Sequence, residues 1–349
     1  MTQKIIYSNQ VDTTLMTIIG GGNYNTVIVL VDENTRRLVL PRLHCLSEAH
    51  VIEMPSGDKN KTLDTLTAVW QQLERCGATR KSLLVNLGGG VVTDLGGMAA
   101  ATFKRGIDFV NVPTTLLAAV DASVGGKTGI NFMGLKNEIG VFACARSVIL
   151  STCFFDTLPI VELKSGYAEM LKHGMLSNHS NFMELVESDI MPIELEPMLE
   201  LLHKSVKVKE EIVEQDPKEH GQRKALNLGH TVGHAFESKA LADGSPVPHG
   251  YAVAWGLVVE AVLSHMLKGF PSADLYVLAG FVKSNYGAFH ITCDDYDELI
   301  DLMRHDKKSR SGEVNCTLLA AFGDVRVDNS IGDDDIKAAL DIYRDLMGI

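Results

Sequence analysis

The first half of the chain alternates short apolar runs with glycine-rich turns and helical stretches, and this alternation restricts the fold more than any other feature. Runs of β-branched or bulky apolar residues occur at 27–31, 82–87, 109–112 and 148–150. Each run has the length and composition of a strand that is buried on both faces. Because strands that alternate with helices form a parallel sheet covered by helices, we expect an α/β domain.

From about Pro159 onward the pattern changes to long helical periodicities, for example at 198–214 and 252–266. A chain of 349 residues is long for a single hydrophobic core, so two domains are expected. We predict an α/β N-terminal, Rossmann-like nucleotide-binding domain over residues 1–158. A mainly α-helical C-terminal domain is predicted over residues 159–349.

The charge and cysteine content exclude several classes of protein. A net charge of −12 argues against general binding to nucleic acid or to an anionic membrane, since both require a basic surface. The six cysteines are scattered without a C-x-x-C pair, which is typical of reduced thiols. The N-terminus lacks the apolar core of a signal peptide, and we expect no apolar run near the roughly 20 residues that cross a bilayer. We therefore expect a cytoplasmic protein.

A buried strand at 84–87 runs into Gly88-Gly89-Gly90 and then into a helix that contains Asp94. Glycines there let backbone N–H groups approach a diphosphate, and the helix N-terminus favours an anion. The spacing differs from G-x-G-x-x-G, so a tight turn without a ligand is an equally good interpretation. Asp32 and Asn34 follow the strand at 27–31 and could bind a ribose, although such residues are more often turn formers.

A second glycine loop runs from Asp121 to Gly129 and is followed by Lys136-Asn137. It ends in Gly-Lys-Thr, but Asp121 stands where a P-loop needs glycine, so the P-loop interpretation fails. A loop that holds Lys127 near a carboxylate and an amide suits a phosphorylated polyol. The alternative is a solvated lysine on a surface turn.

Helical spacing places Arg223, Asn227, His230 and His234 on one stripe of a predicted helix. Imidazoles at i and i+4 can bind one divalent metal, and His249 offers a third nitrogen. Two histidines one turn apart also occur by chance on solvated helices.

Within the predicted helix at 166–172, Glu169 could complete a carboxylate and histidine metal site. In isolation, Glu169 and Lys172 are more often an exposed pair of small energetic value. Lys209 and the cluster Asp306-Lys307-Lys308 have the same ordinary interpretation as solvated charges.

Seven segments together resemble the 3-dehydroquinate synthase family: LGGGVVTDLGG, AATFKRG, VPTTLLAAVDASVGGKTGIN, GYAEMLKHG, LNLGHTVGHA, PHG and HDKK. Their order and spacing match that family between residues 84 and 308. The resemblance implies NAD, one divalent metal (zinc, cobalt or another) and a homodimer. It also implies conversion of 3-deoxy-D-arabino-heptulosonate 7-phosphate to 3-dehydroquinate and phosphate, by transient oxidation, phosphate elimination, re-reduction and aldol closure.

The resemblance also implies roles for individual residues. The metal ligands would be Glu169, His230 and His249, which moves His234 to the substrate's phosphate. The other substrate contacts would be Asp121, Lys127, Asn137, Lys172, Lys209, Arg223, Asn227 and one of Lys307 and Lys308, with Arg105 reaching the site of the partner subunit. The cofactor contacts would be Asp32, Asn34, Lys61, Gly89, Gly90, Asp94, Thr114, Thr115, Lys136, Thr157 and Glu162.

The sequence departs from the family in two places. Tyr251 stands where an acidic residue commonly follows His-Gly, which raises the question of what orients His249. Met133-Gly134-Leu135 replaces the usual Pro-Leu-Gly but leaves Lys136 and Asn137 in register. Three alternatives stay open: another sugar-phosphate cyclase, a metal-dependent polyol dehydrogenase of similar fold, and a catalytically silent nucleotide-binding protein.

Overall fold

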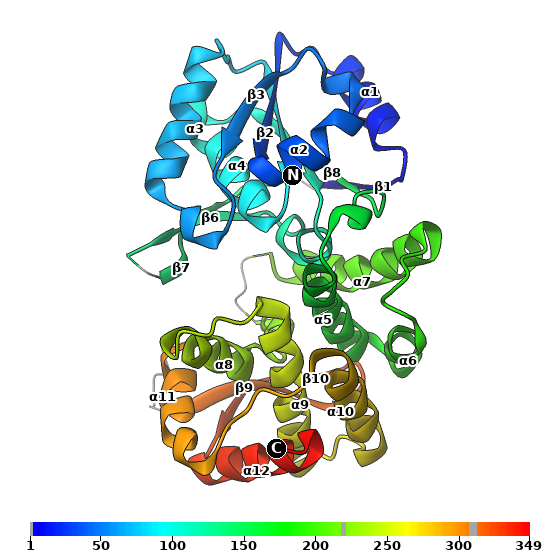
Figure 1. Cartoon of the computed structure of the whole chain (residues 1–349), viewed down its shortest axis with the longest axis vertical. Helices are drawn as coiled ribbons and strands as arrows, with labels where there is room; N and C mark the ends of the chain where they lie inside the picture. Colours follow the sequence, from blue (N-terminus) through cyan, green and yellow to red (C-terminus); the bar gives the residue numbers. More distant parts are fainter. Residues whose placement is uncertain (1–2, 134, 218–220, 307–312) are drawn as a thin grey trace. The chain divides into compact units, whose positions relative to one another are not determined.

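The computed structural model describes residues 3–133, 135–217, 221–306 and 313–349. The chain divides into two compact units (Figure 1). Unit 1 comprises residues 1–159 and 193–203, and unit 2 comprises residues 160–192 and 204–349. The segment 193–203, which lies within the predicted helical domain, therefore groups with unit 1.

Unit 1 is built on a six-stranded sheet in the order β1-β8-β5-β4-β2-β3, in which all neighbouring strands are parallel. The strands are β1 Lys4–Tyr7, β2 Thr26–Asp32, β3 His50–Met54, β4 Ser82–Gly88, β5 Asp108–Pro113 and β8 Ser147–Leu150. The four predicted strands are confirmed as β2, β4, β5 and β8. The two strands that were not predicted, β1 and β3, are the edges of the sheet.

Helices cover both faces of this sheet, with α1 and α2 toward one side and α3 and α4 toward the other (Figure 1). Val29 and Val85 on one face share a core with Leu15 of α1. On the other face Gly96 of α4 lies against Leu30 and Asn86. Burial of both faces explains why β2 and β4 are continuous apolar runs. The helical segments are α1 Val11–Gly21, α2 Glu33–Leu38, α3 Leu63–Arg75 and α4 Gly90–Thr102, with 3₁₀ turns η1 Leu40–Arg42, η2 His44–Leu46, η3 Asp58–Asn60, η4 Phe103–Arg105 and η6 Phe155–Thr157.

An antiparallel hairpin of β6, Lys127–Phe132, and β7, Leu135–Phe142, also belongs to unit 1 and was not predicted. Every described residue of β7 is exposed. The hairpin is preceded by a single π-helical turn, η5, Ala118–Ala122.

Unit 2 is mainly helical, and the predicted fold class is thereby confirmed. Its helices are α5 Ile160–Ser177, α6 His179–Glu187, α8 His230–Ala242, α9 His249–Lys268, α10 Ser272–Tyr286, α11 Tyr296–Asp306 and α12 Asp333–Met347, with 3₁₀ segments η7 Gln222–Asn227 and η8 Cys293–Asp295. Helix α7, Leu195–Gln215, begins in unit 1 and ends in unit 2. Helices α7 and α9 confirm the predicted periodicities. A hairpin of β9, Val314–Ala321, and β10, Asp324–Ile331, was not predicted.

Helix α9 lies at the centre of unit 2, with α8, α10, α12 and β9 around it (Figure 1). By length and composition α9 could cross a membrane, so the expectation that no apolar run approaches that length was wrong. However, 78% of its most apolar window is buried inside the structure. The apolar residues of α9 therefore form the core of unit 2.

Candidate functional site

The carboxyl ends of β2 and β4 lie side by side in unit 1, at the point where the order of the strands reverses. From β2 the chain continues to β3 on one side of the sheet, whereas from β4 it continues to β5 on the other. Ligands of open α/β sheets bind at such reversal points. Asp32 ends β2 and Gly88 ends β4, so both predicted cofactor segments begin here.

The glycine turn after β4 packs closely against the segment that follows β5. The Thr114 N–H donates to the Gly88 carbonyl at 3.0 Å. A β-carbon at Gly89 would lie 3.2 Å from the Thr115 side chain, and one at Gly90 would lie 3.3 Å from the Ala122 methyl. Gly89 is the N-cap of α4 and supplies no side-chain cap. The first N–H groups of a helix have no acceptor within the helix, so this helix end favours an anion.

Asp32 has a structural role in the local fold, which the sequence analysis gave as the alternative to ribose binding. Its carboxylate accepts the Thr35 N–H at 2.8 Å and forms a capping box at the start of α2. Asn34 lies in the first turn of the same helix and is exposed. The cap is therefore observed, and binding of a ribose by Asp32 and Asn34 stays a prediction.

Lys61 is 4% exposed, and its ammonium group contacts two other residues that were predicted to bind ligands. It donates to Asp94 Oδ2 at 2.6 Å and also to the side-chain oxygen of Asn137. Asn137 adopts a φ of 53°, and its N–H donates to the side chain of Asn131 at 2.9 Å. Lys61 thus joins a predicted cofactor residue to a predicted substrate residue.

The other predicted residues of unit 1 have definite places in the fold. Asp121 lies in the π-helical turn η5, a rare local structure that is frequent at functional sites. Lys127 is exposed at the start of β6, after two glycines with positive φ. Lys136 on β7, Arg105 in η4 and Glu162, in the first turn of α5 in unit 2, are exposed, whereas Thr157 is part-buried. Lys307 and Lys308 lie outside the described residues.

The predicted continuous helix through Arg223 and His234 was wrong. Arg223 and Asn227 lie in the 3₁₀ segment η7, and α8 begins only at His230. Gly229 breaks the helix with a φ of 78°, because its N–H donates to the buried carboxylate of Glu260 at 2.6 Å. Only the two histidines share the predicted helical stripe.

The Glu169 carboxylate is fully buried in unit 2 and faces two imidazole nitrogens. Its Oε1 lies 3.3 Å from His230 Nε2 and 3.5 Å from His249 Nε2. Around a tetrahedral zinc ion with bonds of about 2.0–2.1 Å, neighbouring ligand atoms are about 3.3 Å apart. Lys172 pairs with the other carboxylate oxygen, Oε2, so that Oε1 is the oxygen that faces both imidazoles. These side chains therefore fit a single divalent ion.

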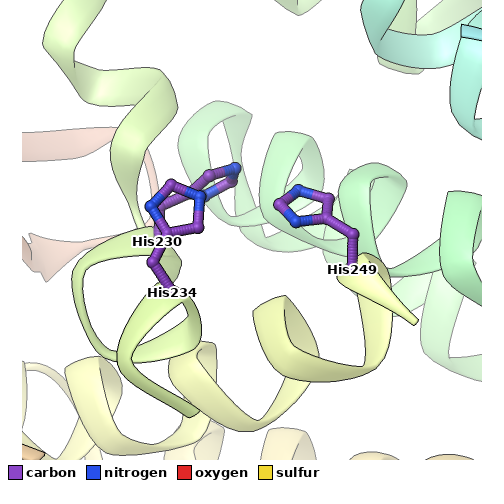
Figure 2. Close-up of side chains that lie close together, drawn as sticks. All are labelled: His230, His234 and His249. Carbon is purple, nitrogen blue, oxygen red and sulfur yellow. The ribbon is translucent and has the colours of Figure 1, made fainter. Parts of the chain in front are cut away.

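His234 lies next to the same cluster, as Figure 2 shows. Its ring centroid is 5.3 Å from that of His230 and 5.7 Å from that of His249. Nitrogen atoms of the three rings lie within 4.8 Å of one another. The geometry therefore allows two ligand sets, one with Glu169 and two histidines and one with three histidines.

The buried charges around Glu169 set the protonation states. Burial opposes ionisation of Glu169, but the adjacent Lys172 ammonium and His230 hold its pKa well below the ordinary value. Burial and Lys172 lower the pKa of His230 to about 4, so its ring is neutral at pH 7. Burial also disfavours the charged form of His249, but hydrogen bonds to Glu169 and Glu237 raise its pKa to about 9.

The ordinary interpretation of Glu169, Lys172 and Lys209 as exposed charges was wrong. Glu169 and Lys172 form an ion pair, and they are 0% and 1% exposed. Lys209 is 5% exposed and Arg223 is 2% exposed. Desolvated charges of this kind concentrate at functional sites, so these residues remain candidates for substrate binding.

Two glycines that sequence reasoning passed over bring α5, α8 and α9 close together. A β-carbon at Gly250 would lie 1.9 Å from the Ser165 carbonyl oxygen of α5. One at Gly256 of α9 would lie 2.1 Å from the Gly229 carbonyl oxygen, just before α8. These close contacts place the three helices that carry Glu169, His230 and His249 within reach of one ion.

The side chain of Tyr251 does not face the cluster. Its ring packs against Trp255 and Tyr286, with centroids 6.0 and 5.0 Å away. His249 Nδ1 instead faces a carboxylate oxygen of Glu237, at 3.2 Å. Sequence reasoning missed Glu237, although it follows His230 by seven residues and thus shares its side of α8.

The family models described as 3-dehydroquinate synthase N-terminal and 3-dehydroquinate synthase C-terminal match residues 51–165 and 166–309. The chain is also similar to the 3-dehydroquinate synthase of Parabacteroides distasonis. The two are 46% identical over 350 residues, which covers 99% of each chain.

Two solved structures share the fold. One is a 2-deoxy-scyllo-inosose synthase complexed with carbaglucose-6-phosphate, NAD⁺ and Co²⁺, with a TM-score of 0.84, 24% identity and coverage of 96% and 95% of the two chains. The other is the 2-epi-5-epi-valiolone synthase of Streptomyces hygroscopicus with NAD⁺ and Zn²⁺, with a TM-score of 0.86, 23% identity and coverage of 99% and 97%. Because the family models match most of this chain and a relative matches nearly all of it, the chain belongs to the 3-dehydroquinate synthase family.

Proposed function

We propose that the chain is a 3-dehydroquinate synthase, which converts 3-deoxy-D-arabino-heptulosonate 7-phosphate to 3-dehydroquinate and phosphate in the biosynthesis of aromatic amino acids. The observation that carries this proposal is the buried Glu169 carboxylate with two imidazole nitrogens on one oxygen. It occurs in a chain that is 46% identical to a relative with that name.

Glu169, His230 and His249 would hold the divalent ion, and the ends of β2 and β4 would hold NAD. The ion would act as a Lewis acid on substrate hydroxyls, while NAD would accept a hydride from the substrate and return it. Glu169 suits the task of a ligand because its carboxylate is ionised and desolvated. His230 suits it because its ring is neutral at pH 7.

The lysines and the histidine proposed as substrate contacts would bind and orient the substrate. Lys127 and Lys209 would hold negative groups of the substrate, and His234 would lie near its phosphate, as the family resemblance implies. Fixed positive groups favour release of phosphate as a dianion, because they stabilise charge where it develops. Holding the substrate in one geometry also lowers the entropic barrier of each later step. Asp121, Asn137, Lys172, Arg223 and Asn227 complete the proposed set of substrate contacts.

We also propose a homodimer in which Arg105 reaches the active site of the partner, and a cytoplasmic location. Arg105 is exposed in η4, at the end of α4. Helix α4 packs against the β6–β7 hairpin, which exposes Met133, Leu135 and Phe142. Exposed apolar side chains on an edge strand are a usual feature of an interface between chains.

One assay tests the proposed activity. The protein is incubated with 3-deoxy-D-arabino-heptulosonate 7-phosphate, zinc and NAD at a concentration far below that of the substrate. We expect phosphate and 3-dehydroquinate in equal amounts and many turnovers per NAD. Accumulation of NADH would indicate a polyol dehydrogenase instead.

Absence of any reaction, with NAD and metal still bound, would favour a different sugar-phosphate cyclase. That second candidate has one observation in its favour, which is the fold shared with the 2-deoxy-scyllo-inosose synthase. Hexose phosphates in the same assay test it directly. Failure to bind metal or to convert any sugar phosphate would leave a silent nucleotide-binding protein.

A further inference from the structure

We infer that Glu237 is a positioning residue, which fixes the orientation and the tautomer of the His249 imidazole so that Nε2 is presented to the metal ion. This inference rests on the proposed metal site and extends it to a residue that the family resemblance did not supply. Glu237 lies on α8, whereas His249 begins α9.

One side of α8 carries three functional groups at the spacing i, i+4 and i+7, which are His230, His234 and Glu237. The close approach of α8 and α9 brings the start of α9 to this side. A β-carbon at Gly233 of α8 would lie 2.9 Å from the Ala252 carbonyl oxygen of α9. The Glu237 carboxylate consequently lies 3.2 Å from His249 Nδ1.

The two imidazoles that face Glu169 are held in the same way by different partners. His230 Nδ1 lies 3.1 Å from the Leu228 carbonyl oxygen, and His249 Nδ1 faces the Glu237 carboxylate. In both rings an acceptor on Nδ1 keeps the proton there and leaves Nε2 to bind a metal. The acceptor for His249 is charged, so it also makes that imidazole a stronger ligand.

His249 depends on such a partner more than His230 does. Its side chain is 28% exposed, compared with 12% for His230, and it lies at the first residue of a helix whose N-cap is Pro248. Packing alone therefore restrains the His249 ring less than the His230 ring. Tyr251, at the position where the family commonly has an acidic residue, packs against Trp255 and Tyr286 instead. Among the described residues, the carboxylate on His249 Nδ1 comes from Glu237.

The test measures metal affinity directly, by competition for Zn²⁺ and Co²⁺ with a chromophoric chelator. Loss of a partner of this kind weakens metal binding by about 10- to 100-fold, and we expect Glu237→Ala to fall in that range. Glu237→Gln, whose amide oxygen can still accept the Nδ1 proton, should weaken binding less. Asp243→Asn is the matched control, because Asp243 is a carboxylate at the C-terminal end of the same helix and pairs with Lys239 instead of a histidine.

Nitrogen NMR of the metal-free protein supplies a readout that a loss of packing alone would not change. In its neutral form the wild-type His249 ring should carry its proton on Nδ1, and Glu237→Ala should give a mixture of tautomers. Wild-type metal affinity and an unchanged tautomer in Glu237→Ala would overturn the inference. His230→Ala separates the two proposals: if it also leaves affinity unchanged, the metal binds elsewhere and the proposed metal site itself fails.

Discussion

The candidate site of unit 1 is built mainly from backbone groups, whereas the candidate site of unit 2 is built from side chains. At the ends of β2 and β4 in unit 1, the groups that would meet a ligand are glycine backbone and the start of α4. In unit 2 they are side chains on α5, α8 and α9. Glycine packs closely in both units. In unit 1, β-carbons at Gly89 and Gly90 would meet neighbouring side chains at 3.2 and 3.3 Å, whereas in unit 2 one at Gly250 would meet the backbone of another helix at 1.9 Å. Substitution of glycine by alanine should therefore affect mainly cofactor binding in unit 1, but both folding and metal binding in unit 2.

The largest effect should come from removal of a metal ligand. We expect His230→Ala to lose bound metal and at least about 10³-fold in turnover, since a Lewis acid contributes several kcal/mol to the transition state. Glu169→Gln should do the same and also destabilise unit 2 by roughly 3–5 kcal/mol, because it leaves Lys172 buried without its carboxylate. Metal content by mass spectrometry and phosphate release check both effects.

His230→Ala is the cleaner of the two variants, since it keeps the buried pair of Glu169 and Lys172 intact. His234→Ala distinguishes the two ligand sets that the geometry allows. With Glu169 as a ligand, His234→Ala keeps its metal and loses turnover. Full turnover of His230→Ala without bound metal would contradict the proposed site.

The next largest effect should follow from Gly250→Ala, which tests the helix contact that builds the site in unit 2. The added methyl would lie 1.9 Å from the Ser165 carbonyl, so the backbones of α5 and α9 must separate. We expect a loss of about 1–3 kcal/mol in the free energy of unfolding, together with weaker metal binding. Urea denaturation and chelator competition measure the two quantities.

Gly280→Ala is the control, because nothing lies within 4 Å of the added methyl and the residue is inside α10. Alanine should stabilise that helix by up to about 1 kcal/mol. If Gly250→Ala behaved like Gly280→Ala, close packing of α5 and α9 would not be what positions the ligands.

Features that depend on local sequence were predictable, whereas features that depend on distant residues or on exposed edges were not. Strands β2 and β4 were predictable because both of their faces are buried, so each reads as one apolar run. The edge strand β3 was missed because three of its five residues are exposed. The break before α8 was missed because it depends on Glu260, which lies 31 residues further along the chain. The residues suggested His230, His234 and His249 as ligands and Glu169 as a possible addition, and only the family resemblance moved His234 out of the ligand set.

A smaller effect is expected from Gly90→Ala in unit 1. The new methyl would lie 3.3 Å from Ala122, a contact that small shifts can relieve, so the free energy of unfolding should change by less than about 1 kcal/mol. NAD should bind about 10-fold more weakly, or about 1.4 kcal/mol, because the methyl stands where a diphosphate would approach the backbone. Calorimetric titration with NAD measures this.

Chelator competition on the same variant makes the comparison between the units sharper. Gly90→Ala should leave Zn²⁺ affinity at its wild-type value. Loss of metal with unchanged NAD affinity would show that the glycine turn of unit 1 does not contact the cofactor.

The smallest effect concerns Asp32, whose observed role as a helix cap can be separated from its predicted role at a ribose. Asp32→Ala removes the side chain that accepts the Thr35 N–H, which should cost about 1 kcal/mol of stability. Asp32→Asn should keep that stability, because asparagine caps helices as well as aspartate does. Both variants should bind NAD several-fold more weakly, since a ribose hydroxyl would lose its charged acceptor. Unchanged NAD affinity in Asp32→Asn would leave Asp32 with the cap alone, and the NAD site of unit 1 would then consist of backbone without this carboxylate.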